Sequence, residues 1–582
     1  MIKTILGQVK EYKAASLVTP AYMVLEVLME MMIPYLMASI IDQGVNQGNL
    51  AHIYKVGAVM IVAALIGLFA GLAGGRYGAK ASAGLAKNMR ETMFKNIQTF
   101  SFANIDKFST AGLVTRLTTD VTNIQMAYQM VLRMSVRAPI SIVVAMGMAF
   151  YINKRIACIY LGAVVFLSIC LYFIMTHANR YFRQIFPKYD DMNASVQENV
   201  SAIRVVKAFV REDTEIDKFK TASNNIYNLF VRAEKNIIVN MPLMMFTVYT
   251  CILLISWIGA KMIVSSTLTT GELMSLLAYC MNILGSLMMF SMVFVMLSMS
   301  AASAERIAEV LNEDATIKNP ENPIMEVADG SIEMRHVHFA YKQGTGEDVL
   351  KDINLSIKSG ETIGIIGGTG SAKTSLVNLI SRLYDVSDGQ VLVGGRDVRE
   401  YDLEVLRDKV SVVLQNNVLF SGTILDNLRW GNKDATVEEC KRACELACAD
   451  EFINRFPDGY ETMIAQGGNN VSGGQKQRLC IARALLKKPA VLILDDSTSA
   501  VDTATDAKIR RAFREEIPDT TKLIIAQRIS SVQDADRIIV MEEGQIDGFG
   551  SHEELLATND IYREVYESQT KGGGDFDEKV GM

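Results

Sequence analysis

The chain has 582 residues, which is too long for one hydrophobic core and therefore predicts at least two domains. Half of the residues are hydrophobic, and 58 lysines and arginines against 64 aspartates and glutamates leave a formal net charge of −6. This balance excludes the strongly basic surface of a nucleic-acid-binding protein, so no nucleic acid is expected among the partners.

The first half of the chain carries six apolar segments near the ~20 residues that cross a bilayer as a helix. They cover residues 17–41, 56–75, 134–153, 156–179, 236–260 and 273–304. The uncharged part of the third covers only 138–153, and full length requires extension back through Arg137 and Arg133. Because the first segment is already of spanning length, we expect no cleavable signal peptide.

Lysines and arginines gather at the N-terminus and in the long segments that follow the second and fourth spans, for example Lys3, Arg76, Arg90, Arg180 and Arg204. Cytoplasmic loops are enriched in these residues. Lys154 and Arg155, between the third and fourth spans, depart from the rule. The pattern predicts a multi-pass protein of the plasma membrane whose N-terminus and C-terminal domain are cytoplasmic.

Two carboxylates, Glu26 and Glu30, lie one helical turn apart near the middle of the first span. Ionisable groups at that depth are costly unless they are paired, solvated or protonated, which makes them candidates for an intramembrane role. One interpretation is recognition of a cationic substrate. The other is an internal pair with Arg133 or Arg137, or placement against a wet cavity, and the sequence favours neither.

The character of the chain changes after the sixth span. Residues 1–315 are predicted to form an all-α transmembrane domain, residues 316–330 a charged, proline-containing linker, residues 331–568 an α/β domain and residues 569–582 a flexible tail. Within the third part, β-rich runs such as "TIGIIG" and "VLILDD" alternate with helical stretches. That alternation is typical of a largely parallel, buried sheet.

Eight cysteines are scattered along the chain, and three of them share one helical face at positions 440, 444 and 448. The spacing suggests a metal site, but no histidine or second cysteine cluster completes one. We therefore expect Cys440, Cys444 and Cys448 to pack a helix as small, reduced thiols.

The run "IGIIGGTGSAKTSLVNLI" is typical of a strand, a glycine-rich turn and a helix that together cradle a phosphate. Lys373 is expected to reach the β- and γ-phosphates, and Thr374 to hold Mg²⁺. Ala372 stands where the G-x-x-x-x-G-K-[ST] pattern has its second glycine, and its methyl is expected to crowd the phosphate. The predicted nucleotide-binding residues of this loop are Gly367, Gly368, Thr369, Gly370, Ser371, Ala372, Lys373, Thr374 and Ser375.

Two further elements belong with this loop. The strand "VLILDDST" delivers Asp495, which is placed to hold Mg²⁺ through water, and beside it Asp496. Between loop and strand, Ser472, Gly473, Gly474 and Gln475 open a helix whose N-terminus can face an anion. Taken alone, that helix is as well explained by ordinary N-capping.

The whole chain resembles a half-size ABC exporter of the type IV fold, a six-helix transmembrane domain followed by a P-loop (RecA-like) nucleotide-binding domain. "VSGGQKQR" is similar to the family signature LSGGQ, and "SAVD" at 499–502, ending in Asp502, to the D-loop. The resemblance implies that Gln415 is the Q-loop glutamine, which also approaches Mg²⁺, and that Tyr341 stacks on adenine. It also implies that residues 198–212 hold a coupling helix that docks on a nucleotide-binding domain.

Two further residues, both expected to act in hydrolysis, depart from the family pattern. The family normally has glutamate at Asp496, to polarise the attacking water, and histidine at Gln527, in the switch loop. A shorter carboxylate is misplaced, and an amide cannot accept a proton at neutral pH. The pair resembles the degenerate half of heterodimeric bacterial multidrug exporters, so we expect slow hydrolysis at this chain's own site, while its signature completes a competent site on a second subunit.

The predicted function is therefore that of an ATP-binding, transmembrane subunit of a heterodimeric multidrug-type exporter. The expected cofactors are ATP and Mg²⁺, and the expected partners are a second half-transporter, the lipid bilayer and a hydrophobic or cationic small molecule. Alternatives are a lipid or peptide exporter, a metal-chelate importer of the same architecture, or a mainly regulatory ATP-binding subunit. The spans exclude a soluble protein.

Overall fold

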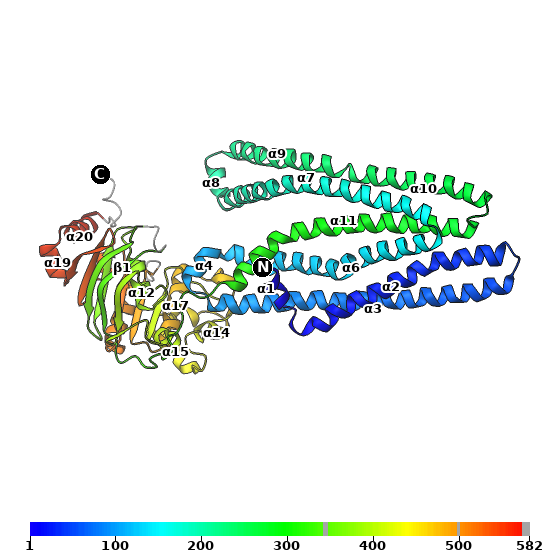
Figure 1. Ribbon diagram of the computed structural model, residues 1–582. Coiled ribbons are helices and arrows are strands. Elements are labelled where there is room, and N and C mark those ends of the chain that lie inside the picture. The colour runs from blue at the N-terminus through cyan, green and yellow to red at the C-terminus, as the bar shows by residue number, and fades with distance from the viewer. Residues whose placement is uncertain (342–346, 497–500, 573–582) are drawn as a thin grey trace. The chain divides into compact units, whose positions relative to one another are not determined.

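The computed structural model describes residues 1–341, 347–496 and 501–572. It divides into two compact units (Figure 1). The first unit consists of Met1–Thr99 and Ser109–Asp314, and the second of Phe100–Phe108 and Ala315–Met582. The short segment Phe100–Phe108, which the sequence places in the transmembrane domain, thus belongs with the C-terminal unit.

The first unit is all helical. Its long helices are α2 (Lys13–Ser39), α3 (Leu50–Thr99), α6 (Val121–Ile152), α7 (Lys154–Ser201), α9 (Glu212–Ile237), α10 (Asn240–Val264) and α11 (Thr270–Asn312). Its short elements are α1 (Ile2–Gly7), η1 (Lys10–Tyr12), η2 (Ile40–Val45), α5 (Thr110–Thr115), η3 (Arg116–Asp120) and α8 (Ile203–Ala208).

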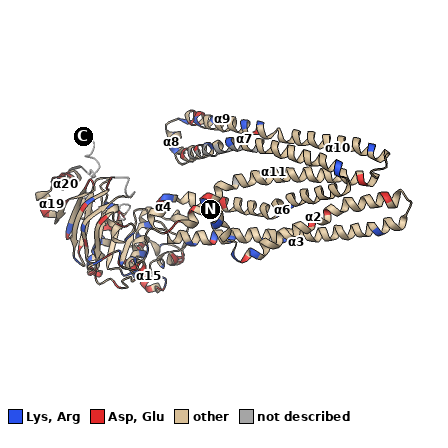
Figure 2. Ribbon diagram, in the orientation of Figure 1, with Lys and Arg blue, Asp and Glu red and all other residues tan. Residues whose placement is uncertain are grey.

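Six helical segments in the described chain are long and apolar enough to cross a membrane, which confirms the predicted all-α domain. In lipid every backbone polar group must be satisfied within the segment, and a helix does this. The helices run well past the predicted spans; α3, for instance, has 50 residues. Figure 2 shows few charged residues along the middle of these helices and more toward their ends.

Hydrogen bonds from buried tyrosines to backbone carbonyls join three of these helices. Tyr160 of α7 donates to the carbonyl of Leu276 in α11 at 2.7 Å, and Tyr279 of α11 donates to the carbonyl of Met31 in α2 at 2.8 Å. Both tyrosines are almost fully buried in one hydrophobic cluster that α2, α6, α7, α10 and α11 share. Their hydroxyls are therefore satisfied inside an otherwise apolar core.

In its described residues, the second unit holds a six-stranded sheet, a four-stranded sheet and a small strand pair. The six-stranded sheet has the order β12-β11-β3-β10-β9-β6 and is parallel except for the edge strand β12. The four-stranded sheet has the antiparallel order β2-β1-β4-β5, and β7 pairs with β8. This confirms the predicted α/β fold class with its parallel sheet.

The strands are β1 (Ile332–Phe339), β2 (Leu350–Ile357), β3 (Thr362–Gly367), β4 (Asp388–Val393), β5 (Arg396–Asp397), β6 (Val410–Val413), β7 (Gly422–Thr423), β8 (Met463–Ile464), β9 (Val491–Asp495), β10 (Thr521–Ile525), β11 (Arg537–Glu542) and β12 (Gln545–Gly550). The helices are α4 (Phe102–Phe108), α12 (Lys373–Ile380), α13 (Leu403–Lys409), α14 (Ile424–Leu428), α15 (Val437–Leu446), α16 (Asp450–Ile453), α17 (Gly473–Leu485), α18 (Thr503–Glu516), α19 (His552–Thr558) and α20 (Asp560–Gly572). Single turns are η4 (Gly459–Glu461), η5 (Gln466–Gly468) and η6 (Ile529–Ser531).

Both faces of the parallel sheet are buried, which explains why its strands are continuously apolar in sequence. Along β9, Leu492 and Leu494 belong to the cluster on the side of α14, α15 and α17, whereas Val491 and Ile493 belong to the cluster shared with α12 and the antiparallel sheet. This alternation follows from the two-residue period of a strand. It positions the C-terminal end of β9, Asp495, beside the first turn of α12.

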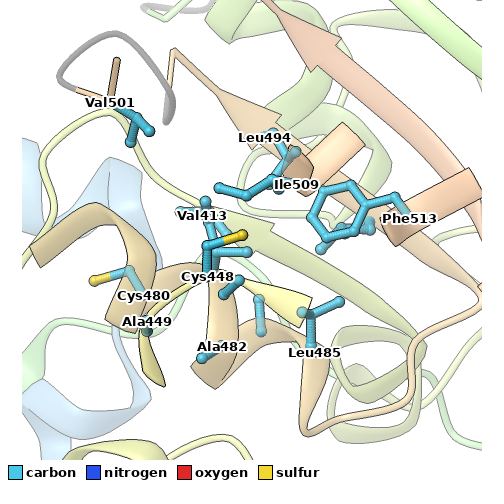
Figure 3. Packing of buried hydrophobic residues seen from close by; sticks show 14 of the residues in the cluster. Val413, Cys448, Ala449, Cys480, Ala482, Leu485, Leu494, Val501, Ile509 and Phe513 are labelled. Atoms are coloured by element: carbon cyan, nitrogen blue, oxygen red, sulfur yellow. The ribbon is translucent and has the colours of Figure 1, made fainter. Parts of the chain in front are cut away.

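The cysteines pack as expected for small apolar side chains. Cys440, Cys444, Cys448 and Cys480 are all buried in the cluster on the α17 side of the sheet. Figure 3 shows Cys448 and Cys480 among their apolar neighbours. Burial raises the pKa of Cys444 to about 12, so that its thiol stays protonated. Among the described residues no group of three or more metal-binding side chains occurs.

The C-terminal helix runs further than the sequence suggests. The predicted tail begins at residue 569, but α20 continues to Gly572. Tyr562 and Val565 of this helix, both within the predicted domain, are buried in the same cluster as Ile529 and Val532 and pack α20 against it. The remainder of the predicted tail, 573–582, lies outside the described residues.

Candidate functional site

The glycine-rich turn between β3 and α12 closes tightly around its own backbone. Gly370 has a φ of +86°, and the amide of Ser371 donates to the carbonyl of Gly368 at 3.2 Å. A Cβ on Gly367 would lie 2.3 Å from the carbonyl oxygen of Met541 and 2.5 Å from Ser371 Oγ. Only glycine fits at Gly367, because the loop passes so close to β11.

Ala372 adopts the left-handed conformation, with φ +70° and ψ 23°, immediately before α12 begins. This is the position at which the sequence pattern has glycine. A non-glycine residue in this conformation costs about 1 kcal/mol or more. The alanine therefore places backbone strain in the loop, in addition to any crowding of a phosphate.

Lys373 lies folded within the loop. Its ammonium donates to the carbonyls of Gly367 and Gly368 at 2.8 and 2.7 Å and to Ser371 Oγ at 3.2 Å. Thr369 and Gly370 complete the turn. The arrangement combines a cation with the N-terminus of α12, so it favours an anion.

Thr374 and Asp495 lie together at the end of the sheet. Thr374 Oγ1 donates to Asp495 Oδ1 at 3.1 Å, and Asp495 is only 2 % exposed. Burial raises the pKa of Asp495, while the Thr374 hydrogen bond and the Lys373 charge oppose that shift. A hydroxyl oxygen and a carboxylate oxygen at this spacing fit the oxygen ligands that Mg²⁺ prefers.

Asp496 and Gln527, the two expected hydrolytic residues that depart from the family pattern, are neighbours. Gln527 Nε2 donates to Asp496 Oδ2 at 3.3 Å. The backbone amide of Asp496 donates to the carbonyl of Ile525 at 3.2 Å, and its φ is +47°, a conformation that aspartate tolerates better than most residues. The structure thus brings the altered acidic residue and the altered switch residue into direct contact.

The segment around Gln527 is held by a residue that the sequence did not single out. Gln569 of α20 accepts from the Ile529 amide at 2.9 Å and donates to the Gln527 carbonyl at 3.0 Å. These residues are about forty positions apart, and no motif links them. The contact arises from the packing of α20 against η6, so only the three-dimensional structure could reveal it.

Tyr341, predicted to stack on adenine, follows β1 and lies beside the phosphate loop. It is 48 % exposed, and its hydroxyl shares a hydrogen bond of 2.8 Å with Ser375 Oγ in the first turn of α12. The exposed ring is available for stacking at a point tied directly to the loop. The neighbouring residues 342–346 lie outside the described residues.

The signature segment forms a capped helix N-terminus. Ser472 Oγ accepts from the Gln475 amide at 3.3 Å, and Gln475 Oε1 accepts from the Ser472 amide at 2.9 Å. Ser472 and Gly473 are exposed, and Gly474 is partly exposed. The helix α17 packs against α14, α15 and β6, and its N-terminus, with the exposed Ser472 and Gly473, is a place where an anion can bind.

For the other predicted site residues the structure gives fewer contacts. Gln415 is exposed after β6, and within the described chain its side chain makes no hydrogen bond. Asp502 caps α18. Its carboxylate accepts a hydrogen bond from the Thr505 amide, which holds the pKa of Asp502 below its ordinary value. Ser499 and Ala500 of the predicted D-loop lie outside the described residues.

Within the membrane-spanning unit, Arg137 of α6 contacts both carboxylates of α2. Its guanidinium donates to Glu26 Oε1 and, at 2.7 Å, to Glu30 Oε2. Of the two arginines considered from the sequence, Arg137 therefore makes the internal pair. One guanidinium against two carboxylates leaves a formal charge of −1, and the buried Glu26 Oε2 has no hydrogen-bond partner among the described residues.

Comparison with known proteins gives matches over both units. Residues 21–299 match the ABC transporter transmembrane region, and residues 350–499 match the ABC transporter family. The chain is 36 % identical to the Bacillus subtilis protein described as uncharacterized ABC transporter ATP-binding protein YfiB, over 97 % of this chain and 98 % of that protein.

Two other relatives carry more specific names. The ATP-dependent lipid A-core flippase of Desulfotalea psychrophila is 32 % identical over 83 % of this chain and 84 % of that protein. The fatty acid ABC transporter ATP-binding/permease protein of Mycobacterium bovis is 33 % identical over 78 % of this chain and 71 % of that protein.

Proposed function

Because the chain belongs to the ABC transporter family, as a membrane-spanning region and an ATP-binding domain in one polypeptide, we propose that it is one half of a heterodimeric exporter. In this proposal its own nucleotide site binds ATP and hydrolyses it slowly. The observation that carries the proposal is the contact between Asp496 and Gln527.

The phosphate loop and β9 supply the binding half of the site. Lys373 and the N-terminal amides of α12 would hold the phosphates, and Tyr341 would stack on the base. Thr374 and Asp495, already 3.1 Å apart, would hold Mg²⁺, with Gln415 approaching from the loop after β6. The bound ion would neutralise charge on the phosphate oxygens.

The hydrolytic half of the site is weak. A water that attacks the γ-phosphate needs an acceptor for its proton, and here that acceptor would be Asp496. Its arm is one methylene shorter than glutamate, and one of its oxygens already accepts a hydrogen bond from Gln527. The amide can only donate to the carboxylate; it cannot take up a proton. Together these features favour binding over cleavage.

The signature supports a role toward a second subunit. Ser472 and the following glycines present an open helix N-terminus, which in this proposal completes the nucleotide site of the partner chain. The partner is expected to carry glutamate and histidine at the positions that match Asp496 and Gln527. One fast and one slow site would then work in the same assembly.

Two separate apolar surfaces support an interaction in which a segment of one subunit docks on a domain of the other. Around α8, Phe209 and Val210 are 73 % and 79 % exposed. On the C-terminal unit, a groove of about 320 Å³ is lined in part by Val418, Phe420 and Trp430. The rings of Phe420 and Trp430 are stacked, with centroids 4.0 Å apart. We assign the groove to the α8 segment of the partner subunit. Exposed apolar patches of this kind mark interaction sites.

The substrate is proposed to be a hydrophobic or amphipathic small molecule, as in multidrug efflux. Arg137 contacts both Glu26 and Glu30. A cationic substrate would therefore meet a residual formal charge of −1 from these three side chains, rather than the −2 of two unpaired carboxylates. The names of the flippase and the fatty acid transporter favour a lipid-like substrate as the second candidate.

Steady-state phosphate release by the chain purified alone, in nanodiscs with Mg²⁺ and ATP, tests the slow site. Slow hydrolysis here means about 0.1 s⁻¹ or less, ~100-fold below the ~10 s⁻¹ of a median enzyme. Asp495→Asn provides the zero-rate control. Brisk, cooperative hydrolysis by this chain alone would overturn the proposal.

A further inference from the structure

Four aromatic rings join the proposed base-stacking residue to helix α4. Tyr384 lies in the turn after α12 and meets Tyr341 edge to face, with ring centroids 5.2 Å apart and an interplanar angle of 88°. Phe339 contacts both tyrosines, at 4.9 and 5.6 Å. On the far side, Tyr384 meets Phe102 of α4 edge to face at 5.9 Å and 80°. Tyr384 is thus in contact with both Tyr341 and α4.

A hydrogen bond reinforces the contact with α4. The Tyr384 hydroxyl donates to Asp106 Oδ2 at 2.7 Å. Burial and the neighbouring Asp106 carboxylate both raise the pKa of Tyr384, so the hydroxyl remains a donor at any physiological pH. A charge-assisted hydrogen bond of this length is among the stronger kinds.

The rest of the surroundings holds Tyr384 in a fixed position. Arg382, which is 5 % exposed, donates to Asp385 at 2.9 Å across the tyrosine, and Arg407 donates to the Arg382 carbonyl at 2.8 Å. A ring anchored by its neighbours on both sides transmits a displacement instead of absorbing it. The turn that carries Tyr384 is therefore stiff.

Helix α4 is also hydrogen-bonded to the linker. The buried Asn104 accepts from the amide of Thr316 at 3.1 Å and from Ser101 Oγ at 2.8 Å. In the chain, α4 directly follows α3, which contains the second span, and precedes α5. A restraint on α4 consequently acts on the connections that lead to the membrane-spanning helices.

We propose that Tyr384 is the positioning residue through which helix α4 senses an adenine base stacked on Tyr341. This inference rests on the proposed ATP site. A base on the exposed face of Tyr341 restrains that ring, and the restrained ring holds Tyr384 in place from the other side. The hydroxyl of Tyr384 then stabilises Asp106, so that α4 opens less often when the base is bound.

Amide hydrogen exchange in the full-length chain, reconstituted in nanodiscs, tests the proposal. Two nucleotides are compared, Mg·ATP and inorganic Mg·triphosphate, which has phosphates but no base. Exchange in Lys373–Ile380 (α12) reports phosphate binding, and exchange in Phe102–Phe108 (α4) reports the relay. In the wild type, ATP should slow both segments, α4 by about fivefold or more, the lower range of ordinary allosteric couplings. Triphosphate should slow α12 alone.

Two variants remove the link from opposite sides. Tyr384→Phe keeps the ring but loses the hydroxyl, and Asp106→Ala removes the acceptor on the exposed face of α4. Both should retain the slowing of α12 by ATP and lose that of α4. Tyr401→Phe is the matched control, because its hydroxyl is also buried but donates to the Val393 carbonyl at 2.8 Å, away from α4. It should behave as the wild type.

The outcomes separate the relay from the nucleotide site. If ATP slows α4 in both variants as in the wild type, or if triphosphate slows α4 as strongly as ATP does, the relay is refuted while the nucleotide site stands. If ATP fails to slow α12 even in the wild type, the proposed nucleotide site itself is refuted, and the relay with it.

Discussion

Lengthening the carboxylate at position 496 should convert the proposed slow site into a faster one. Asp496→Glu moves the carboxylate outward by about one bond length, and a misplacement of ~1 Å can cost about 100-fold in rate. A hundredfold change corresponds to about 2.7 kcal/mol of activation free energy. The hydrogen bond from Gln527 to Asp496 is long, at 3.3 Å, and its loss costs no more than about 1 kcal/mol. The gain in rate should therefore prevail.

Two features of the site refine this expectation. The φ of Asp496 is +47°, which glutamate tolerates less well, so Asp496→Glu should lower the melting temperature. The strain is present in both the ground state and the transition state, so it does not enter the rate. Gln527→His alone should change the rate by less than about tenfold, because the short carboxylate remains, and with Asp496→Glu it should add to the gain.

The assay is phosphate release by each variant in nanodiscs, with the Kd for ATP measured in parallel. Asp458→Glu, which lengthens an exposed carboxylate before η4, is the matched control and should leave the rate unchanged. The reasoning is refuted if Asp496→Glu and the double variant bind ATP normally but hydrolyse it no faster than the wild type.

Three further substitutions test other parts of the structure. Ala372→Gly should raise the free energy of unfolding by up to about 1 kcal/mol, since it removes a side chain from a left-handed residue, and a lower value measured by denaturant titration would contradict this. Arg137→Gln should destabilise the protein in detergent by about 2 kcal/mol, because two carboxylates lose their counter-ion, and adding Glu26→Gln and Glu30→Gln should restore most of the loss. Gln569→Ala should speed amide exchange at Ile529 about fivefold, because the Ile529 amide loses its hydrogen bond to Gln569, whereas Thr570→Val on the same helix should not. Equal exchange in the two variants would exclude a role of Gln569 in holding this segment.

The spans and the buried strands could be predicted from the sequence because each depends on a local pattern. An uncharged run of bilayer length forms a helix wherever it sits, and "VLILDD" is apolar throughout because both faces of β9 are covered. The same locality explains the phosphate loop. Even its irregular residue, Ala372, occupies the left-handed position at which the pattern has glycine.

The contacts that tie the site to its surroundings could not be predicted in this way. Gln569 reaches the switch segment from a helix forty residues later, and Tyr384 joins Phe102 and Asp106 across almost three hundred residues. Such contacts depend on tertiary packing, and no spacing in the chain encodes them. The choice between Arg133 and Arg137 as the partner of Glu26 was open for the same reason.

The central claim is that this chain holds ATP without readily cleaving it, and the nucleotide left bound after turnover tests that claim most directly. The transporter is incubated with Mg²⁺ and ATP, free nucleotide is removed by rapid gel filtration, and the nucleotide retained by this chain is identified by chromatography. Intact ATP, retained through many turnovers of the partner subunit's site, is the predicted result. Retention of ADP alone would contradict the account.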